Sequence, residues 1–251
     1  MTNLEYIKWE RDEGIGIIYL NNSTEEFQTK KKIDFADQIK QWLSDDIKGL
    51  IITEQRKKIG ADNDIKITVE KISDLEKTDQ NKIFQNQVIG LIENLNIPVL
   101  AALDGICFGD VLQIALACDL RFCTAQSVFI LPGINRNPDR FLEIINRMEK
   151  TSGQQKTMEM SDSGVLLNSP KAFELKIVDR VISEGDFMNH CREYISGLVK
   201  NRSAKVIHSI IRSFRNNIIL EENEALIKDV EIFCDLAGDF TLYGPDENAR
   251  N

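Results

Sequence analysis

Short apolar runs and longer amphipathic segments alternate along the first half of the chain. Residues 6–9 and 15–20 are β-rich runs separated by the turn signal Asp12-Glu13-Gly14, which predicts a hairpin. Apolar residues recur at helical spacing between positions 35 and 43, which predicts a helix. The continuous apolar run at 49–53 is typical of a strand buried on both faces.

The same alternation continues after a polar, charged segment at 54–81, which we expect to be a loop. Apolar positions at helical spacing predict a helix over 83–95, and Pro98 ends it. A buried strand is predicted at 99–103, a buried helix at 111–118 and a further strand at 120–123. Strand, helix and strand in this order indicate an α/β fold with a parallel sheet.

Beyond residue 140 the pattern becomes mostly helical. One strand is predicted at 178–182, and helices are predicted at 140–150, 152–162, 170–175, 186–200, 203–217 and 221–237. The chain has no Pro/Gly/Ser-rich linker and no internal repeat. We therefore expect a core over residues 1–185 and a helical C-terminal region over 186–251.

Composition narrows the classes of partner. The 251 residues are 42% hydrophobic, enough for a sizeable core, and the formal net charge of −9 argues against nucleic acid or an anionic membrane as the main partner. The start of the chain does not resemble a signal peptide, and no apolar stretch is long enough to span a membrane, so a cytoplasmic location is expected. The five cysteines show no metal-binding spacing, which indicates reduced core thiols.

Two segments carry a specific resemblance. Residues 97–105 (IPVLAALDG) and 115–121 (ALACDLR) resemble the most characteristic stretch of the crotonase (enoyl-CoA hydratase/isomerase) superfamily, in which a strand KPVIAAVNG leads through a glycine-rich turn into a helix ending in ALACDIR. Weaker matches follow the family order: 49–53 resembles the strand before the first active-site loop, 64–66 the end of FSAGADIK, and 169–181 the AxxAxxxGLVdrV segment. The chain is identified as a divergent member of this family.

The resemblance implies a specific architecture and site. It implies a spiral of ββα turns with two roughly perpendicular sheets, and a helical C-terminal region that assembles a homotrimer or a dimer of trimers. It also implies a site for an acyl group linked as a thioester to coenzyme A or to the phosphopantetheine arm of an acyl carrier protein. No other cofactor and no metal is expected.

Crotonases hold the thioester carbonyl with two backbone N–H groups, each worth about 3–4 kcal/mol where charge develops on the oxygen. By the resemblance, the first donor is Ala61, in the loop that also carries Asp62, Asp64 and Ile65. The second donor is Asp110, where residues 108–111 (FGDV) match the family's LGGG. The substrate-binding residues implied in this way are Asp62, Asp64, Ile65, Phe108, Gly109 and Gly133.

Asp110 departs from the family, because glycine allows close backbone approach whereas aspartate adds bulk and a charge that opposes an oxyanion. Three interpretations stay open. Asp110 could be a helix N-cap, a recruited general acid or base, or the mark of an inactive site.

Both hydratase glutamates are absent. Gln113 stands at the first position and Gly133 at the second, and neither side chain exchanges a proton with water at neutral pH. Asp139 and Glu143 follow the second lost position and could replace it, although Pro138-Asp139 is also typical of a helix start. The candidate catalytic residues are therefore Asp110, Gln113 and Asp139.

Ordinary structural roles also account for several of these residues. Surface solvation accounts for Asp62 and Asp64, and core packing accounts for the thiol of Cys107, which has no paired base nearby in sequence. His190 and His208 both fall in predicted C-terminal helices, where surface or interface positions are expected.

Two functions remain. The first is an acyl-thioester enzyme with non-standard enolate chemistry, such as an isomerase, lyase or decarboxylase of fatty-acid or polyketide type, that is not a standard hydratase. The alternative is a catalytically inactive crotonase-fold protein retained for binding or assembly.

Overall fold

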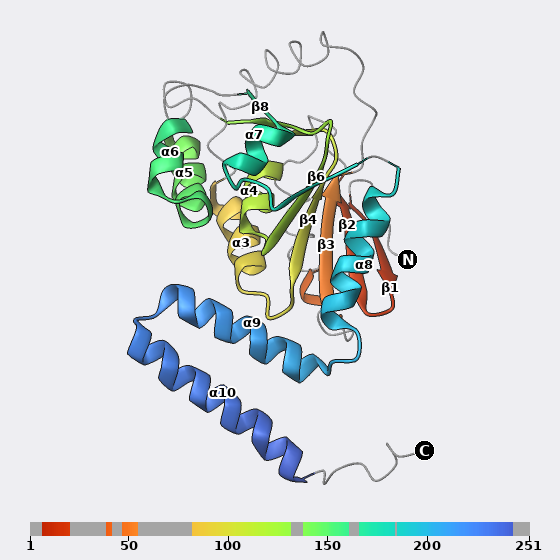
Figure 1. Ribbon diagram of the computed structural model, residues 1–251, viewed down its shortest axis with the longest axis vertical. Helices are drawn as coiled ribbons and strands as arrows, with labels where there is room; N and C mark the ends of the chain where they lie inside the picture. The colour runs from red at the N-terminus through yellow and green to blue at the C-terminus, as the bar shows by residue number, and fades with distance from the viewer. Residues whose placement is uncertain are drawn as a thin grey trace. The chain divides into compact units, whose positions relative to one another are not determined.

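The computed structural model describes residues 7–20, 39–41, 47–54, 82–131, 138–160, 166–183 and 185–242 (Figure 1). The chain divides into two compact units, Met1–Leu198 and Val199–Asn251. This division lies one helix later than the expected boundary at residue 185, because α8 (Phe187–Val199) packs on the sheet of the first unit.

The first two strands form the predicted hairpin. β1 (Ile7–Asp12) pairs antiparallel with β2 (Ile15–Leu20). The two residues between them, Glu13 and Gly14, have φ values of 43° and 83°. Positive φ at both positions is the geometry of the tight turns whose twist matches that of the flanking strands.

Four further strands complete the main sheet: β3 (Gly49–Glu54), β4 (Val99–Leu103), β6 (Leu120–Thr124) and β9 (Arg180–Ile182). The strand order is β1-β2-β3-β4-β6-β9, and every pair from β2 to β9 is parallel. The predicted parallel sheet is confirmed. All five residues of β4 are buried, as expected for a central strand covered on both faces.

Helices cover both faces of this sheet. The first unit contains α3 (Lys82–Glu93), α4 (Gly109–Ala117), α5 (Pro138–Ser152), α6 (Gln154–Met160) and α7 (Ser169–Glu174) in addition to α8. On β6, Cys123 joins the buried cluster that includes Leu112 of α4, whereas the preceding Phe122 contacts Tyr194 of α8, with ring centroids 5.0 Å apart. Alternate side chains of one strand therefore pack against different helices.

A second, three-stranded sheet was not predicted from the hydrophobic pattern. It consists of β5 (Ile106–Cys107), β7 (Val128–Ile130) and β8 (Leu166–Asn168), in the order β5-β7-β8. Strands of two or three residues are too short to show a period. The family resemblance did imply a second sheet.

Arg121 and Asp179 join the start of β6 to the segment before β9. The Asp179 carboxylate accepts a hydrogen bond from the Arg121 backbone N–H at 2.7 Å, and the Arg121 guanidinium lies 3.2 Å from the same carboxylate. In return, the Asp179 N–H donates to the Arg121 carbonyl at 2.7 Å. These contacts fix the register at which β9 begins.

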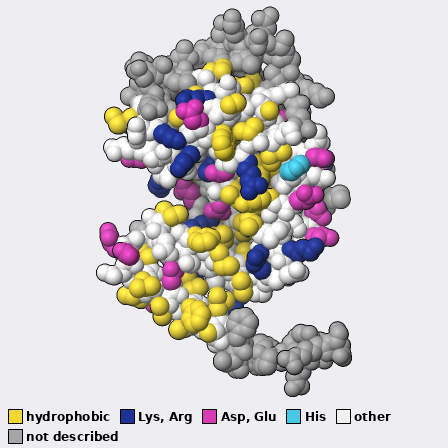
Figure 2. All heavy atoms as spheres, viewed as in Figure 1, with side chains coloured by type: hydrophobic (Ala, Val, Ile, Leu, Met, Phe, Trp, Pro, Cys, Tyr) yellow, Lys and Arg dark blue, Asp and Glu magenta, His cyan; other side chains and the backbone are white. Residues whose placement is uncertain are grey.

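The second unit is a helical hairpin of α9 (Ala204–Ile219) and α10 (Glu222–Leu242), close to the predicted ranges. Ser203 caps α9 by accepting a hydrogen bond from the Val206 N–H at 3.2 Å. Figure 2 shows hydrophobic side chains gathered on these helices, and the large exposed ones are Ile210, Phe214, Ile218, Leu226, Ile227, Val230 and Phe233. None of the helices in the described ranges has the length and apolar content to cross a bilayer.

Candidate functional site

The turn from β4 into α4 is held by a buried hydroxyl. Ser127 Oγ donates to the Leu103 carbonyl at 2.9 Å and accepts from the N–H groups of Gly105 and Thr124 at 3.3 and 3.2 Å. Gly105 has φ 109°, a conformation that favours glycine, and its carbonyl accepts from the Val128 N–H at 2.7 Å. These bonds set where the chain enters α4.

Helix α4 begins with a second left-handed residue. Phe108 is the N-cap, with φ −153° and ψ 168°, and Gly109 follows with φ 53°. The first intrahelical bond runs from the Leu112 N–H to the Phe108 carbonyl at 3.3 Å, so the N–H groups of Gly109, Asp110 and Val111 precede it. A helix N-terminus favours negative charge on a ligand.

The N-cap interpretation of Asp110 is therefore wrong. Phe108 occupies that position, and Asp110 lies in the first turn of the helix, half-buried. The helix begins two residues earlier than an aspartate cap would require, because Gly109 adopts the positive φ that starts it. An aspartate in the first turn is still favoured by the helix dipole.

Gln113 is fully buried, with an exposed fraction of 0%. Its Nε2 donates to Oε2 of Glu143 on α5 at 3.3 Å, while its Oε1 has no hydrogen-bond partner among the described residues. An unsatisfied buried acceptor costs about 1–3 kcal/mol. Asp110 and Gln113 are three residues apart and share a face of α4.

Arg147 links the backbone at Glu143 to helix α3. Arg147, one turn later on α5, donates from Nη1 to the Glu143 carbonyl and from Nε to Glu93 on α3, both at 3.3 Å. Helix α5 begins at Pro138, as predicted, so Asp139 is its second residue; the side chain of Asp139 is outside the described set. Of Asp139 and Glu143, Glu143 is the one whose side chain is described, and it is in contact with Gln113.

A small cavity lies on the other side of α4, at the ends of β2, β3 and β4. It is bounded by Leu20, Ile52, Thr53, Glu54, Ala101, Leu103, Val111, Ile114 and Ala115. Its volume is about 10 Å³, which is room for one water molecule at most. An acyl chain enters here only if these side chains move.

Several predicted site residues lie outside the described residues. These are the loop residues Ala61, Asp62, Asp64 and Ile65, and Gly133 after β7. Of the predicted substrate-binding set, Phe108 and Gly109 are described, and both are half-buried at the start of α4.

The thiols and imidazoles do not enter the candidate site. Cys107, Cys118, Cys123 and Cys191 are buried free thiols, as expected, whereas Cys234 is exposed on α10, which corrects the expectation that all five are core residues. Burial raises the pKa of Cys123 and of Cys191 to about 12, so both stay protonated at neutral pH.

Both histidines are exposed, as expected for surface positions. Among the described residues no three His, Cys, Asp or Glu side chains gather in a way that could hold a metal ion.

The family model described as enoyl-CoA hydratase/isomerase matches residues 10–239. The chain belongs to this family. A fatty acid oxidation complex subunit alpha from Shewanella halifaxensis is 27% identical over 83% of this chain and 30% of its own length. A 4-chlorobenzoyl coenzyme A dehalogenase-1 from an Arthrobacter species is 27% identical over 55% of each chain. The chain thus spans less than two thirds of these curated relatives.

Solved structures of the enoyl-CoA hydratase/isomerase family show the same fold. An enoyl-CoA hydratase/isomerase from Cupriavidus metallidurans CH34 has a TM-score of 0.75 at 16% identity, covering 94% of this chain and 90% of that one. Pseudomonas aeruginosa DspI has a TM-score of 0.75 at 17% identity, covering 95% and 98%. The expected crotonase-type α/β fold, with two sheets and C-terminal helices, is confirmed.

Sequence reasoning raised Glu143 as a candidate but missed its contact with Gln113. The two residues are 30 positions apart on different helices, and their meeting depends on how α5 packs against α4. The helical period places Gln113 on one face of its helix, but it does not reveal what lies opposite.

A carboxyl group at position 113 should destabilise the protein in a pH-dependent way. Gln113→Glu places a second carboxyl where Nε2 lies 3.3 Å from Glu143, and both burial and the like charge raise the pKa of the new carboxyl above the ~4.3 of the unfolded chain. A raised carboxyl pKa costs stability only above the unfolded value. Urea unfolding should show a loss of about 2–4 kcal/mol at pH 7 and little loss at pH 4.

The matched control is the double variant Gln113→Glu/Glu143→Gln, which reverses the pair without a second charge. It should recover most of the stability at pH 7. Equal stability of the single variant at both pH values would contradict the buried contact.

Proposed function

We propose that this protein binds an acyl thioester at the start of α4 and stabilises an enolate-type charge on its carbonyl, in a reaction other than ordinary hydration. The observation that carries the proposal is the pairing of a family-type helix start at Gly109 with a non-ionisable, fully buried Gln113 three residues after the donor position at Asp110. The helix start would supply a backbone donor to the thioester oxygen, whereas Gln113 cannot act as the first hydratase carboxylate.

The thioester oxygen would lie against the first-turn N–H groups of α4, with Asp110 N–H and Ala61 N–H as the two donors. Family membership and the direction of the helix dipole support this placement. A donor of this kind contributes about 3–4 kcal/mol when charge develops on the oxygen.

Glu143 is the proton-transfer group that the geometry favours. Its carboxylate is half-buried beside Gln113, and the Gln113 amide donates to Oε2 at 3.3 Å. This bond orients the carboxylate, and Oε1 would then accept the proton. Asp110 and Asp139 remain the second and third candidates. Taking a proton from the α-carbon of the acyl group would leave an enolate held by the N–H donors.

The substrate class follows from the family: an acyl group carried by coenzyme A or by the phosphopantetheine of a carrier protein. The name of one relative, 4-chlorobenzoyl coenzyme A dehalogenase-1, supports coenzyme A and a reaction other than hydration. The name of another, a fatty acid oxidation complex subunit, supports an acyl substrate. No other cofactor is proposed, and a cytoplasmic location agrees with such substrates.

Exchange of the acyl α-proton tests this function. Butyryl-CoA in deuterated buffer should gain deuterium at its α-carbon, followed by mass spectrometry, and Glu143→Gln should slow this exchange about 100-fold or more. Glu149→Gln, an exposed residue on the same helix, should exchange like the wild type. The same protein should hydrate crotonyl-CoA at least about 100-fold more slowly than an ordinary hydratase. No exchange by the wild type would reject the enzyme.

A second function, binding or assembly without catalysis, is favoured by two observations. The cavity beside α4 holds about 10 Å³, and Asp110 brings a carboxylate to the donor position. Both features oppose an acyl oxyanion in the usual place. This protein would then use the fold as a scaffold.

Asp110→Gly separates the two functions. If the site is degraded, removing the carboxylate should tighten acyl-CoA binding by about tenfold, because one opposing charge near a thioester oxygen costs on the order of 1 kcal/mol. If Asp110 is a recruited acid or base, the same change should abolish α-proton exchange. Calorimetric titration with butyryl-CoA and the exchange assay measure both quantities. No change in either removes Asp110 from the site.

We also propose that the apolar stripes of α9 and α10 are covered by other copies in a trimer or a dimer of trimers. Ile210, Phe214 and Ile218 recur every four residues on α9 and are all exposed in the single chain. Light scattering should give a trimer or hexamer, and Phe214→Asp with Phe233→Asp should give smaller species. His208→Asp, an exposed polar position on α9, is the control and should not change the mass. A monomeric wild type at micromolar concentration contradicts the proposal.

A further inference from the structure

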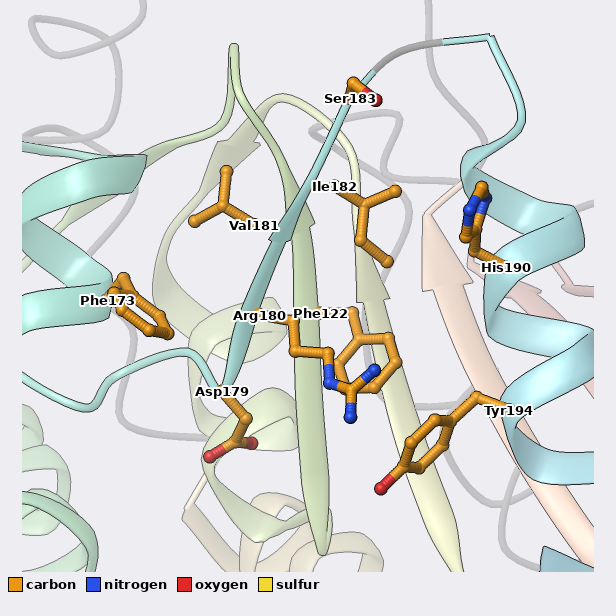
Figure 3. Close-up of a pocket in the computed structure, with 9 residues that line it drawn as sticks. All are labelled: Phe122, Phe173, Asp179, Arg180, Val181, Ile182, Ser183, His190 and Tyr194. Carbon is orange, nitrogen blue, oxygen red and sulfur yellow. The ribbon is translucent and has the colours of Figure 1, made fainter. Parts of the chain in front are cut away.

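A second hollow lies at β9, the edge strand of the main sheet, and extends from α7 to α8. Its volume is about 580 Å³, within the range of small-molecule sites. Figure 3 shows that β9, α7 and α8 form its walls, and its lining residues are Phe122, Phe173, Asp179, Arg180, Val181, Ile182, Ser183, His190 and Tyr194. We call it the β9–α8 groove.

Arg180 places a positive charge in this groove. Its guanidinium carbon lies 4.6 Å from the centroid of the Tyr194 ring and 5.3 Å from that of Phe122. The two rings meet edge to face, so the guanidinium is held over an aromatic pair. Since β9 pairs with β6 at Phe122 and Arg180, the strand register itself places the cation there.

The positive charge of Arg180 is not balanced by a carboxylate among the described residues. The one carboxylate in the groove, that of Asp179, is engaged by the backbone and the guanidinium of Arg121. Within the described ranges, Arg180 contacts the two rings and forms no ion pair. In a chain of net charge −9, an exposed arginine held over two rings, with no carboxylate partner among the described residues, is a ready anion-binding group.

Next to Arg180, the β9 wall that faces α8 is apolar, and Ser183 and His190 lie at the upper end of the groove in Figure 3. Figure 3 shows Arg180 and Ile182 both pointing toward α8, as residues two apart on a strand must. His190 shares the α8 wall with Tyr194, and its Nδ1 lies 3.0 Å from the Asp186 carbonyl, so Nδ1 carries the hydrogen and Nε2 points elsewhere. The groove thus pairs one cation with an apolar surface.

We propose that the β9–α8 groove binds a small carboxylic acid with an apolar or aromatic body. The carboxylate pairs with the Arg180 guanidinium in a two-point contact, and the body lies along Ile182 and the aromatic floor. A single guanidinium with a hydrophobic wall suits a monoanion better than a phosphate, because Arg180 is the one fixed cation among the described lining residues. Arg180 and Ile182 face α8, whereas Cys123 of the neighbouring strand packs with α4, so the proposed contacts are separate from those of the acyl-thioester site.

Benzoate and its neutral relative benzamide are matched probes. Titration of the full-length protein, followed by ligand-observed NMR, should show benzoate binding with a dissociation constant of about 1 mM or tighter, and benzamide binding at least tenfold more weakly. Saturating butyryl-CoA should leave benzoate binding unchanged. Inorganic phosphate at the same concentration should not displace benzoate.

Arg180→Gln should weaken benzoate binding about tenfold or more, and Arg180→Lys should fall between the two because an ammonium keeps the charge but loses the planar two-point contact. Arg11→Gln, an exposed arginine on β1 at the opposite edge of the sheet, should bind like the wild type. Circular dichroism melting checks that each variant is folded. Equal binding of benzoate and benzamide, unchanged binding by Arg180→Gln, or displacement by butyryl-CoA or phosphate would each overturn the proposal.

Discussion

The burial of α4 is the constraint on which the rest of this structure depends. The helix lies between the parallel sheet and helices α3 and α5, and every residue from Val111 to Ala117 is buried. A buried polar group must find a partner inside the protein or cost about 1–3 kcal/mol. One polar side chain, that of Gln113, lies in that buried stretch. Its contact with Glu143 therefore couples the position of α5 to the chemistry of the site.

The same constraint separates the path of the backbone at the start of α4 from the choice of side chains there. The turn at Gly105, the hydroxyl of Ser127 and the left-handed Gly109 serve the path of the backbone, and that path must be kept for β4, α4 and β6 to pack. The side chains at positions 110 and 113 project from the finished helix. They can change without altering the path, so a crotonase fold does not by itself fix the chemistry of its site.

The sheet separates two chemical environments by the alternation of its strands. Residues of β6 point in turn toward the α4 side and the α8 side, so that Cys123 lies in the core and Phe122 forms the floor of the β9–α8 groove. The Arg121–Asp179 contacts neutralise the carboxylate at one end of this groove and set the start of β9. Arg180 is consequently placed over Phe122 and Tyr194 with its own charge unmatched among the described residues.

The sequence by itself determined the elements with a clear period or a clear turn signal. The hairpin at Glu13-Gly14, the fully apolar strand at 99–103, the start of α5 at Pro138 and the helices of the C-terminal third follow from local preferences, because hydrophobic spacing and turn residues act over a few positions. The family motifs added the second sheet.

Only the tertiary structure decided which side chains meet. The strands of the small sheet have two or three residues and form because β5, β7 and β8 are brought together by packing. Gln113 and Glu143 are 30 positions apart, and Phe122 and Arg180 are aligned by strand pairing across 58 positions. Contacts at this separation depend on helix packing angles and on strand register, and a local pattern carries no information about either.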